Sequence, residues 1–410
     1  MSNPDVQLAR DGADSRRSKT ARNVILGVLK QLRGAGLMIS EQGCEPLFFG
    51  DDSAPLQGVI EVHRRRAYRR VLLGGSIAAG ESFIDGDWTT PNLTAVLQLL
   101  AENLGLVDKI EARLSWLSAP LNGLIHLLRS NSRKQARKNI SAHYDLGNAF
   151  YQGFLDSQML YSSAWYQEPQ MTLEQAQQAK MRRLCEQLQL RAADHLLEIG
   201  TGWGAMAEFA AREYGCQVTT TTISREQYDF AVRRIEQAGL SDQVTVLFED
   251  YRALRGQYDK LVSIEMIEAV GKRYLPTFFK RCNALLKPHG RMAIQAITIA
   301  DQRYKYYSRN VDFIQRYVFP GGFLPSITAM SEAMTRHTGL VVRDLFDIGA
   351  DYARTLHEWR ERVVSYWSQQ VAPDSDDRFK RLWLFYLCYC EAGFRARTIS
   401  TVQLTAERRG

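Results

Sequence analysis

The stretch between residues 195 and 299 alternates short apolar runs with helical patterns, and this alternation restricts the fold more than any other feature of the chain. Runs such as HLLEI (195–199) and KLVSIEM (260–266) have the length and composition of buried strands, whereas AMAEFAAREY (205–214) has the apolar spacing of a helix. Strands that alternate with helices in this way form a mostly parallel sheet with helices on both faces. We therefore predict an α/β, doubly wound fold for this part of the chain.

Shifts in composition indicate how the 410 residues divide into domains. Residues 1–22 are polar and predict a flexible leader, and residues 23–128 predict an additional, smaller N-terminal domain. Residues 129–139 are rich in basic residues and predict a linker. Residues 140–410 then form the domain that contains the alternating stretch.

The composition excludes several classes of protein. No apolar run is long enough to cross a membrane and the N-terminus has no signal-peptide pattern, so membrane contact is expected to be peripheral and cytoplasmic. The six cysteines form no CxxC pair and have no nearby histidine at ligand spacing, so we expect reduced thiols and no metal site. The net charge of +7 favours anionic partners, such as phospholipid headgroups, nucleic acid or phosphorylated substrates.

The strongest local motif is E-I-G-T-G-W-G (198–204), which follows a predicted strand and opens a predicted helix. Glycines let a backbone approach a ligand closely, and a helix N-terminus favours polar or anionic groups. The spacing G-x-G-x-G after an acid differs from the G-x-G-x-x-G of dinucleotide binders, and the next strand ends in Thr222 rather than in an acid. We predict that Gly200, Gly202 and Gly204 bind S-adenosylmethionine. A nicotinamide or flavin cofactor and a purely structural turn are the alternatives.

Polar residues also follow the third and fourth predicted strands, at the edge where a doubly wound sheet binds ligands. After the third strand, Asp250 can accept a hydrogen bond from an adenine amino group and Tyr251 can stack on its ring. The alternative role for Asp250 is a helix N-cap. After the fourth strand, Glu265 and Glu268 stand where a group can reach the substrate, although either can be a solvated acid at a helix start.

A longer series of motifs links these features to one family. In chain order they are HYDLGNAFY (143–151), LYSSAWY (160–166), EIGTGWG, TISREQ (222–227), EAVG (268–271), DFIQRYVFPGG (312–322), DYARTLHEW (351–359) and CEAGFRAR (390–397). Together they resemble the cyclopropane-fatty-acyl-phospholipid synthases and their relatives, the mycolic acid cyclopropane synthases. The resemblance extends from Ile140 to the C-terminus and, more weakly, over residues 45–128, which resemble the N-terminal domain of members that act on phospholipid.

The resemblance implies a Rossmann-like class I methyltransferase fold and a set of contacts to S-adenosylmethionine. The positions that match these contacts are Tyr161, Ser162, Gly200, Gly202, Gly204, Thr222, Ser224, Gln227, Asp250, Tyr251 and Arg252.

The resemblance also implies a bicarbonate ion beside the reacting carbon, held by positions that match Glu268, Tyr352, Ser163 and Ile297. Two of the surrounding positions depart from the family pattern. Ser163 stands where the family usually has cysteine, and Gln295 stands where it usually has histidine. An amide can donate a hydrogen bond but cannot relay a proton as an imidazole can. The anion site therefore either survives with altered basicity or is lost, which leaves Glu268 as the base.

Two further features take a role from the resemblance. Cys390 matches a cysteine proposed as reactive in the family, although we favour its alternative role as a packed core thiol. The aromatic residues between 303 and 323 match a segment that helps to enclose the lipid chain.

The implied reaction is transfer of a methyl carbon to the cis double bond of an unsaturated acyl chain in membrane phospholipid, followed by ring closure to a cyclopropane. Loss of a different proton gives a methyl or methylene branch instead. The alternatives are a small-molecule methyltransferase, since plant alkaloid N-methyltransferases share many of these motifs, and a membrane-binding protein with a degenerate site.

Two basic stretches, HRRRAYRR (63–70) and RKQARK (133–138), agree with an anionic membrane surface on the inner face, although each can also be a solvated face. We expect no nucleic acid partner, because the chain has no nucleic-acid-binding motif. We allow for a homodimer.

Overall fold

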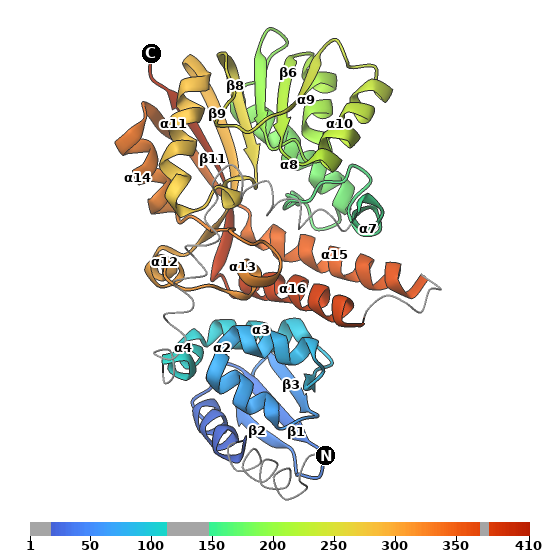
Figure 1. Cartoon of the computed structure of the whole chain (residues 1–410), viewed down its shortest axis with the longest axis vertical. Coiled ribbons are helices and arrows are strands. Elements are labelled where there is room, and N and C mark those ends of the chain that lie inside the picture. The colour runs from blue at the N-terminus through green and yellow to red at the C-terminus, as the bar shows by residue number, and fades with distance from the viewer. Residues whose placement is uncertain (1–17, 113–146, 370–376) are drawn as a thin grey trace, which may run out of the picture. The chain divides into compact units, whose positions relative to one another are not determined.

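The computed structural model describes residues 18–112, 147–369 and 377–410 (Figure 1). They form two compact units, and each is described by itself. Unit 1 comprises the described residues up to 112 together with residues 377–398, and unit 2 comprises residues 147–369 and 399–410. The division differs from the predicted contiguous domain over 140–410, because a segment near the C-terminus packs into unit 1.

The described residues include the end of the predicted leader but none of the predicted linker. Residues 18–22, at the end of the predicted leader, lie in a helix that continues to residue 29 and buries Ala21 and Ile25. The predicted linker at 129–139 lies outside the described residues.

Unit 1 contains, in its described part, a four-stranded sheet in the order β2-β1-β3-β4. The strands are β1 (Gly36–Glu41), β2 (Leu47–Gly50), β3 (Gln57–Val62) and β4 (Trp88–Thr89), and the helices with assigned bounds are α2 (Arg66–Ile84), α3 (Leu93–Glu102), α4 (Leu104–Ala112) and α16 (Asp377–Arg395). Strands β1 and β3 are parallel, and the other pairs are antiparallel.

Helix α16 reaches unit 1 from the far end of the sequence and packs on α2 and α3. Its Glu391 is buried and accepts a hydrogen bond from Thr94 Oγ1 of α3 at 3.1 Å. The other carboxylate oxygen of Glu391 binds Arg395 at 2.8 Å. Since a buried carboxylate must be paired or hydrogen-bonded, these contacts fix the register of α16 on α3.

The basic stretch 63–70 of unit 1 is largely engaged in ion pairs within the unit. Arg66 binds the buried Asp87 at 2.8 Å, and Arg70 binds both Asp85 and Asp87, at 2.8 and 2.9 Å. Arg64 lies 3.4 Å from Asp87. Much of the positive charge that the sequence suggested for a membrane surface is therefore neutralised locally.

Unit 2 contains, within residues 147–369 and 399–410, a seven-stranded sheet in the order β10-β11-β9-β8-β5-β6-β7. The strands are β5 (His195–Ile199), β6 (Gln217–Thr222), β7 (Val244–Phe248), β8 (Tyr258–Ile264), β9 (Leu286–Ile299), β10 (Leu340–Asp347) and β11 (Ile399–Arg408). Strands β5 to β9 pair in parallel, and β11 runs antiparallel to both β9 and β10. The predicted doubly wound α/β fold is confirmed.

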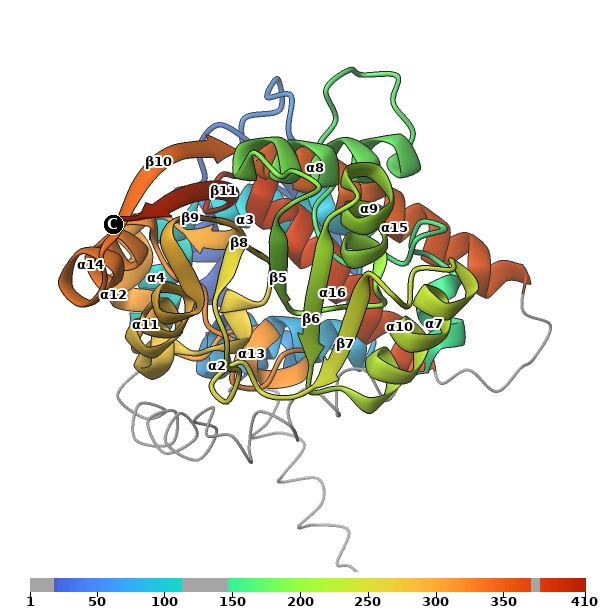
Figure 2. The same ribbon diagram turned by 90° about the horizontal axis from the view of Figure 1, so that it is seen from above.

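The described helices of unit 2 include members that cover both faces of this sheet. They are α7 (Asn148–Gln152), α8 (Leu173–Leu188), α9 (Ala205–Tyr214), α10 (Arg225–Gln237), α11 (Leu275–Leu285), α12 (Asp301–Tyr307), α13 (Phe313–Tyr317), α14 (Ile327–His337) and α15 (Gly349–Gln369). Figure 2 shows α8 and α9 on one side of the strands and α11 on the other.

Side-chain alternation along the strands separates the two cores. Leu196 of β5 and Val262 of β8 pack with α8 and α9, whereas their neighbours Leu197 and Leu261 pack with α11 and α14. Because successive strand residues point to opposite faces, near-continuous apolar strands are required to fill both cores. The apolar runs in the sequence have this composition.

The parallel arrangement places the ends of β5, β6, β7 and β8 at one edge of the sheet. The glycine motif, TISREQ, FEDYR and the two glutamates after β8 all follow these ends and therefore gather there. This edge is the usual ligand-binding region of a doubly wound sheet.

No helix in the described ranges is long and apolar enough to cross a membrane. The longest of the described helices, α15, has 21 residues and carries its charged residues between Asp351 and Arg362, which is typical of a helix that is partly exposed at a protein surface.

The start of α8 provides a stability test. The spacing of Thr172 and Gln175 predicts a capping box, and the structure contains both of its hydrogen bonds, at 2.9 and 3.3 Å. We expect Thr172→Ala to lower the free energy of unfolding by about 1 kcal/mol, because one helical N–H loses its acceptor. Urea unfolding followed by circular dichroism measures the change, and Thr172→Ser, which keeps the hydroxyl, should restore most of it. An alanine variant as stable as the wild type would contradict the assignment.

Candidate active site

The glycine motif forms a tight loop between β5 and α9. Gly200, Gly202 and Gly204 have φ angles of 103°, 53° and 89°, a region that favours glycine. The N–H groups of Gly200 and Thr201 donate to the carbonyl of Thr221 on β6, at 3.0 and 3.1 Å, which holds the loop against the neighbouring strand. A Cβ atom on Gly202 would meet open space, so the loop presents bare backbone to a ligand.

Glu198, the acid that precedes the glycines, is buried at the end of β5. Its Oε2 accepts a hydrogen bond from Thr220 Oγ1 at 2.6 Å. Burial raises the pKa of Glu198 to about 8, although the bond from Thr220 and the charge of Arg234 act in the opposite direction. The carboxyl group therefore carries a proton over much of the neutral range when no ligand changes its surroundings.

Thr222, Ser224 and Gln227, which match contacts to S-adenosylmethionine, form a local network at the start of α10. Thr222 Oγ1 donates to Gln227 Oε1 at 2.9 Å, and Ser224 is the N-cap whose hydroxyl accepts from the N–H of Gln227. All three residues are buried. Their mutual hydrogen bonds fix the turn after β6 in one conformation.

The segment after β7 is also internally bonded. Asp250 accepts three hydrogen bonds from Arg252, from its backbone N–H and from its guanidinium, at 2.7 to 2.9 Å. No helix follows Asp250, so its alternative role as a helix N-cap is excluded. Tyr251 is buried in the core with its ring edge-on to Phe278, at a centroid distance of 5.5 Å. Its adenine-stacking role stays a prediction.

The segment LYSSAWY forms an aromatic wall. The ring of Tyr161 lies 5.4 Å from that of Tyr151 and 5.2 Å from that of Trp359, and it approaches Phe154 and Phe319 at 6.3 and 6.5 Å. Phe319 belongs to the aromatic segment 303–323, so one part of that segment borders this wall.

The two serines of LYSSAWY have different partners. Ser162 Oγ accepts a hydrogen bond from the buried Lys180 Nζ of α8, at 2.7 Å. Ser163 turns its hydroxyl away, toward the carbonyl of Ala164 at 2.9 Å, and presents its backbone instead. Its N–H donates to Glu265 Oε1 at 2.9 Å and its carbonyl accepts from Gln295 Nε2 at 3.1 Å. A serine in place of cysteine therefore costs little here, because the contact is made by the main chain.

Glu265 is the centre of a hydrogen-bonded cluster. Besides the bond from Ser163, its Oε1 accepts from Gln295 Nε2 at 2.8 Å, and its Oε2 accepts from the Tyr352 hydroxyl of α15 at 2.8 Å. Gln295 is fully buried on β9, opposite Gln403 of β11, whose amide donates to Gln295 Oε1 at 3.0 Å. The Gln295 side chain is thus held by Glu265 at its amide nitrogen and by Gln403 at its amide oxygen.

Glu268 lies beside this cluster in the same turn. Its Oε1 accepts from the N–H of Ile297 at 2.5 Å. Its Oε2 is shielded from solvent and has no hydrogen-bond partner among the described residues. Burial and then the negative charge of Glu265 raise the pKa of Glu268 to about 8. The N–H of Phe323 donates to the carbonyl of Glu268 at 2.8 Å, which joins the aromatic segment to this turn.

The predicted catalytic residues fall into three groups. Ser163, Gln295 and Tyr352 each form a hydrogen bond with Glu265. Glu268 and Ile297 form a hydrogen bond with each other. Cys390 lies on α16 in unit 1. Cys390 is reduced and partly exposed. The role of Cys390 stays a prediction.

Sequence reasoning missed Lys180 and Gln403, and it gave Glu265 no settled role. A signal for Lys180 is present, because Gln177 and Lys180 interrupt the apolar face of α8 and both are fully buried. Burial lowers the pKa of Lys180 to about 8, and the charges of Glu265 and Asp156 act in the opposite direction.

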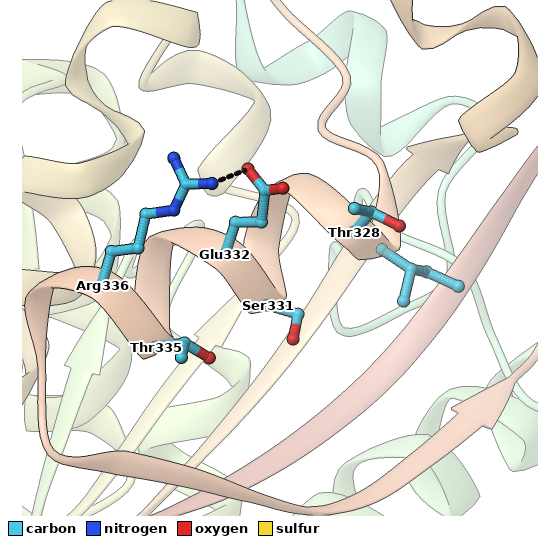
Figure 3. A pocket seen from close by; sticks show the side chains of 6 residues that line it. Thr328, Ser331, Glu332, Thr335 and Arg336 are labelled. Carbon is cyan, nitrogen blue, oxygen red and sulfur yellow. Dashed lines mark ion pairs between the residues drawn. The ribbon is translucent and has the colours of Figure 1, made fainter.

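A separate hollow lies on the outer surface of α14 (Figure 3). It is lined by Ile327, Thr328, Ser331, Glu332, Thr335 and Arg336. Glu332 and Arg336 form an ion pair across one helical turn at 3.6 Å, of the kind found on solvated helices. None of the predicted site residues lines this hollow.

Comparisons with known proteins agree with this geometry. Residues 131–404 match the family described as mycolic acid cyclopropane synthetase. A tuberculostearic acid methyltransferase of Mycobacterium tuberculosis is 40% identical over 358 residues, which cover 85% of this chain and 83% of the relative. The cyclopropane-fatty-acyl-phospholipid synthase of Escherichia coli is 37% identical over 361 residues, 87% of this chain and 89% of the relative.

Among solved structures, a mycolic acid cyclopropane synthase in complex with SAH and CTAB superimposes with a TM-score of 0.62 at 29% identity, over 66% of this chain and 98% of that one. The fold and the site define a class I methyltransferase that depends on S-adenosylmethionine. The chain belongs to the mycolic acid cyclopropane synthetase family, and the predicted resemblance is confirmed.

The residues at the sheet edge fit S-adenosylmethionine. The left-handed glycines leave a bare backbone cradle, and a Cβ on Gly200 would lie 3.2 Å from Met266, between Glu265 and Glu268. The cradle is therefore adjacent to the two glutamates. We expect the loop backbone to hold the cofactor there, with Tyr161 and Ser162 on the facing wall.

The buried acid of the glycine motif gives a pH-dependent prediction. Because the folded pKa of Glu198 is raised from 4.5 to about 8, the fold favours the protonated form. Its contribution to stability is present below the unfolded pKa and is lost as the pH rises through the folded value. We expect Glu198→Gln, which stays neutral, to reduce the fall in free energy of unfolding of the ligand-free protein between about pH 5 and pH 8.

Urea unfolding at a series of pH values measures this slope. Glu332→Gln on the exposed face of α14 is the matched control and should keep the slope of the wild type. A Glu198→Gln variant with an unchanged slope would show that this carboxyl group does not titrate in that range.

Proposed function

We propose that this chain transfers a one-carbon unit from S-adenosylmethionine to the cis double bond of unsaturated acyl chains in membrane phospholipid, and that the product is a cyclopropane. The observation that carries the proposal is the polar cluster around Glu265, which lies beside the glycine cradle and behind an aromatic wall. A shielded carboxylate in this position suits a reaction that must remove a proton from a poorly acidic carbon.

The chain's own residues meet the demands of this chemistry. Bound S-adenosylmethionine supplies an electrophilic methyl carbon. Attack by the alkene leaves a cation on the acyl chain, and this cation must be kept from water. The rings of Tyr161, Phe319 and Trp359 line the wall with aromatic faces that favour a nearby cation. The pair formed by Glu265 and Glu268 then offers an acceptor for the proton.

A phospholipid substrate is supported by the relative from Escherichia coli, whose name states it and whose match includes much of unit 1. Unit 1 also exposes two apolar side chains that are partners across β1 and β2, Met38 and Phe48, at 37% and 47%. Two neighbouring exposed apolar side chains are suited to contact with a lipid interface. We propose peripheral association with a membrane surface on this basis, and the net charge of +7 favours an anionic one. The second basic stretch, 133–138, lies outside the described residues.

A methyl- or methylene-branched acyl chain is the second candidate product. The 40% identical relative is a tuberculostearic acid methyltransferase by name, and it matches over as much of the chain as the cyclopropane synthase does. A proton is lost in both cases, and the products differ in which bond takes the electron pair.

Labelled cofactor distinguishes these outcomes. The purified protein is incubated with deuteriomethyl S-adenosylmethionine and vesicles of cis-unsaturated phosphatidylglycerol, and the acyl chains are analysed by mass spectrometry and NMR. We expect a ring carbon that retains two deuterium atoms, because ring closure removes one hydrogen from the transferred methyl group. Label in a methyl or exocyclic methylene branch would identify the second candidate.

Controls show whether label reaches the lipid by the proposed reaction. Saturated vesicles should accept no label, and zwitterionic vesicles should accept less if the anionic surface matters. Gly202→Val places a β-branched side chain at a φ of 53° in the cradle and should be inactive. Absence of label from lipid would contradict the proposal, and label in a small amine instead would indicate a small-molecule methyltransferase.

A further inference from the structure

Glu265 adopts a backbone conformation that a non-glycine residue rarely accepts. It follows β8 directly and has a φ of 48°. A residue with a Cβ atom in this region is disfavoured, and such outliers persist where the surroundings hold them and often where function requires them. The carboxylate at the end of this side chain must therefore contribute something that glycine would not.

The surroundings of Glu265 are those of a fixed anion. Three donors from separate elements converge on its two oxygens: the N–H of Ser163, the amide of Gln295 and the hydroxyl of Tyr352. The buried ammonium of Lys180 acts on it electrostatically from α8. Burial raises the pKa of Glu265, and these four groups act to lower it.

Glu268 has a poorer environment for a negative charge. It accepts one hydrogen bond, from Ile297, and its second oxygen has no partner among the described residues. Two neighbouring carboxyl groups that share a buried site do not ionise together readily, so the one with more donors takes the charge. The charged groups that face the pair are Lys180 and, behind it, Asp156. Glu265 is thus the anion of the pair, and Glu268 carries the proton.

These contacts conflict with the predicted bicarbonate site. Three positions that the family resemblance assigns to that ion, Ser163, Gln295 and Tyr352, direct their donors to Glu265 instead. An added bicarbonate would have to displace the carboxylate and would meet its negative charge in a buried space. The residues present do not fit a bicarbonate ion.

We propose that Glu265 supplies, as part of the chain, the proton acceptor of the reaction, so that catalysis requires no bicarbonate. In this step a C–H bond of the transferred methyl group breaks, and its electron pair forms the new C–C bond and neutralises the cation. The proton passes to a carboxylate oxygen of Glu265. The assignment replaces the sequence-based choice of Glu268 as the base, and it rests on the proposed function.

Removal of the side chain tests this assignment. The variant Glu265→Gly relieves the positive φ, so it should fold, and thermal unfolding verifies this. In carbonate-free buffer we expect wild-type activity to be independent of added bicarbonate. The glycine variant should be roughly 10²- to 10⁴-fold slower, the usual range for loss of a general base, and bicarbonate should restore part of its rate.

Two further variants separate a base from a structural residue. Glu265→Gln keeps the shape of the side chain, so it should be inactive and should not respond to bicarbonate, because the amide fills the space. His289→Gly is the matched backbone control: His289 also has a positive φ, of 62°, is exposed, and should keep full activity.

Binding of the ion gives a readout that does not depend on turnover. With ¹³C-bicarbonate and S-adenosylhomocysteine, we expect NMR line broadening for Glu265→Gly and none for the wild type. A wild-type enzyme that loses activity without bicarbonate would overturn the proposal. So would a glycine variant that stays fully active or that binds no bicarbonate. A wild type that transfers no label to lipid would refute the proposed function instead, and the binding result would still decide the role of this site.

Lys180 provides a separate check as a positioning residue. The conversion Lys180→Met removes the buried positive charge near Glu265 and keeps a side chain of similar length. The pKa of Glu265 should rise, because the carboxylate loses an attractive charge. We expect the acidic limb of the pH–rate profile to move to higher pH, since the base must be ionised to act. A variant whose rate is lower at every pH, with the acidic limb at the same pH as in the wild type, would indicate a merely structural role for Lys180. That result would count against its electrostatic pairing with Glu265.

Discussion

The carboxylate of Glu265 is held by donors from three segments that are far apart in the sequence, and the arrangement of the site depends on these bonds. They join the LYSSAWY loop, strand β9 and helix α15 to the end of β8. A buried charge is tolerated only when protein groups form hydrogen bonds or ion pairs with it. Each donor to the Glu265 carboxylate is therefore itself held in place by that carboxylate. Gln295 shows this most clearly, because its amide is fixed by Gln403 on the neighbouring strand as well. The polar cluster therefore positions the aromatic wall and the turn at Glu268 relative to the glycine cradle before any ligand binds.

Much of this architecture follows from local patterns in the sequence. The apolar runs between 195 and 299 indicated the parallel strands, because strands covered on both faces need apolar residues at nearly every position. The glycines at 200, 202 and 204 indicated the cradle, since their φ values are ones that other residues avoid. Residues that follow parallel strands meet at one edge, so the approach of Glu265 and Glu268 to the glycine loop was also predictable.

The parts that could not be predicted depend on contacts between distant segments. Nothing near Glu265 indicates that Tyr352 and Gln295 will donate to it, and Lys180 appears in the sequence as one more charged residue on a helix. The packing of α16 into unit 1 was missed for the same reason, because its partner Thr94 lies almost 300 residues earlier in the chain. The resemblance to a family supplied the positions of Ser163, Gln295 and Tyr352 but assigned them to a different anion. Only the side-chain geometry shows that all three residues contact the chain's own carboxylate at Glu265.

The path of the C-terminal segment affects how the protein is made. The chain leaves unit 2 after α15, contributes α16 to unit 1, and returns as β11, which lies between β9 and β10 inside the sheet. Neither unit is therefore complete until α16 and β11 have left the ribosome, although most of unit 1 is synthesised first. A chain that terminates early would lack both an interior strand and a packed helix, and would expose two unfinished cores to cellular proteases. Folding of both units thus waits for synthesis of the same late segment, residues 377–408.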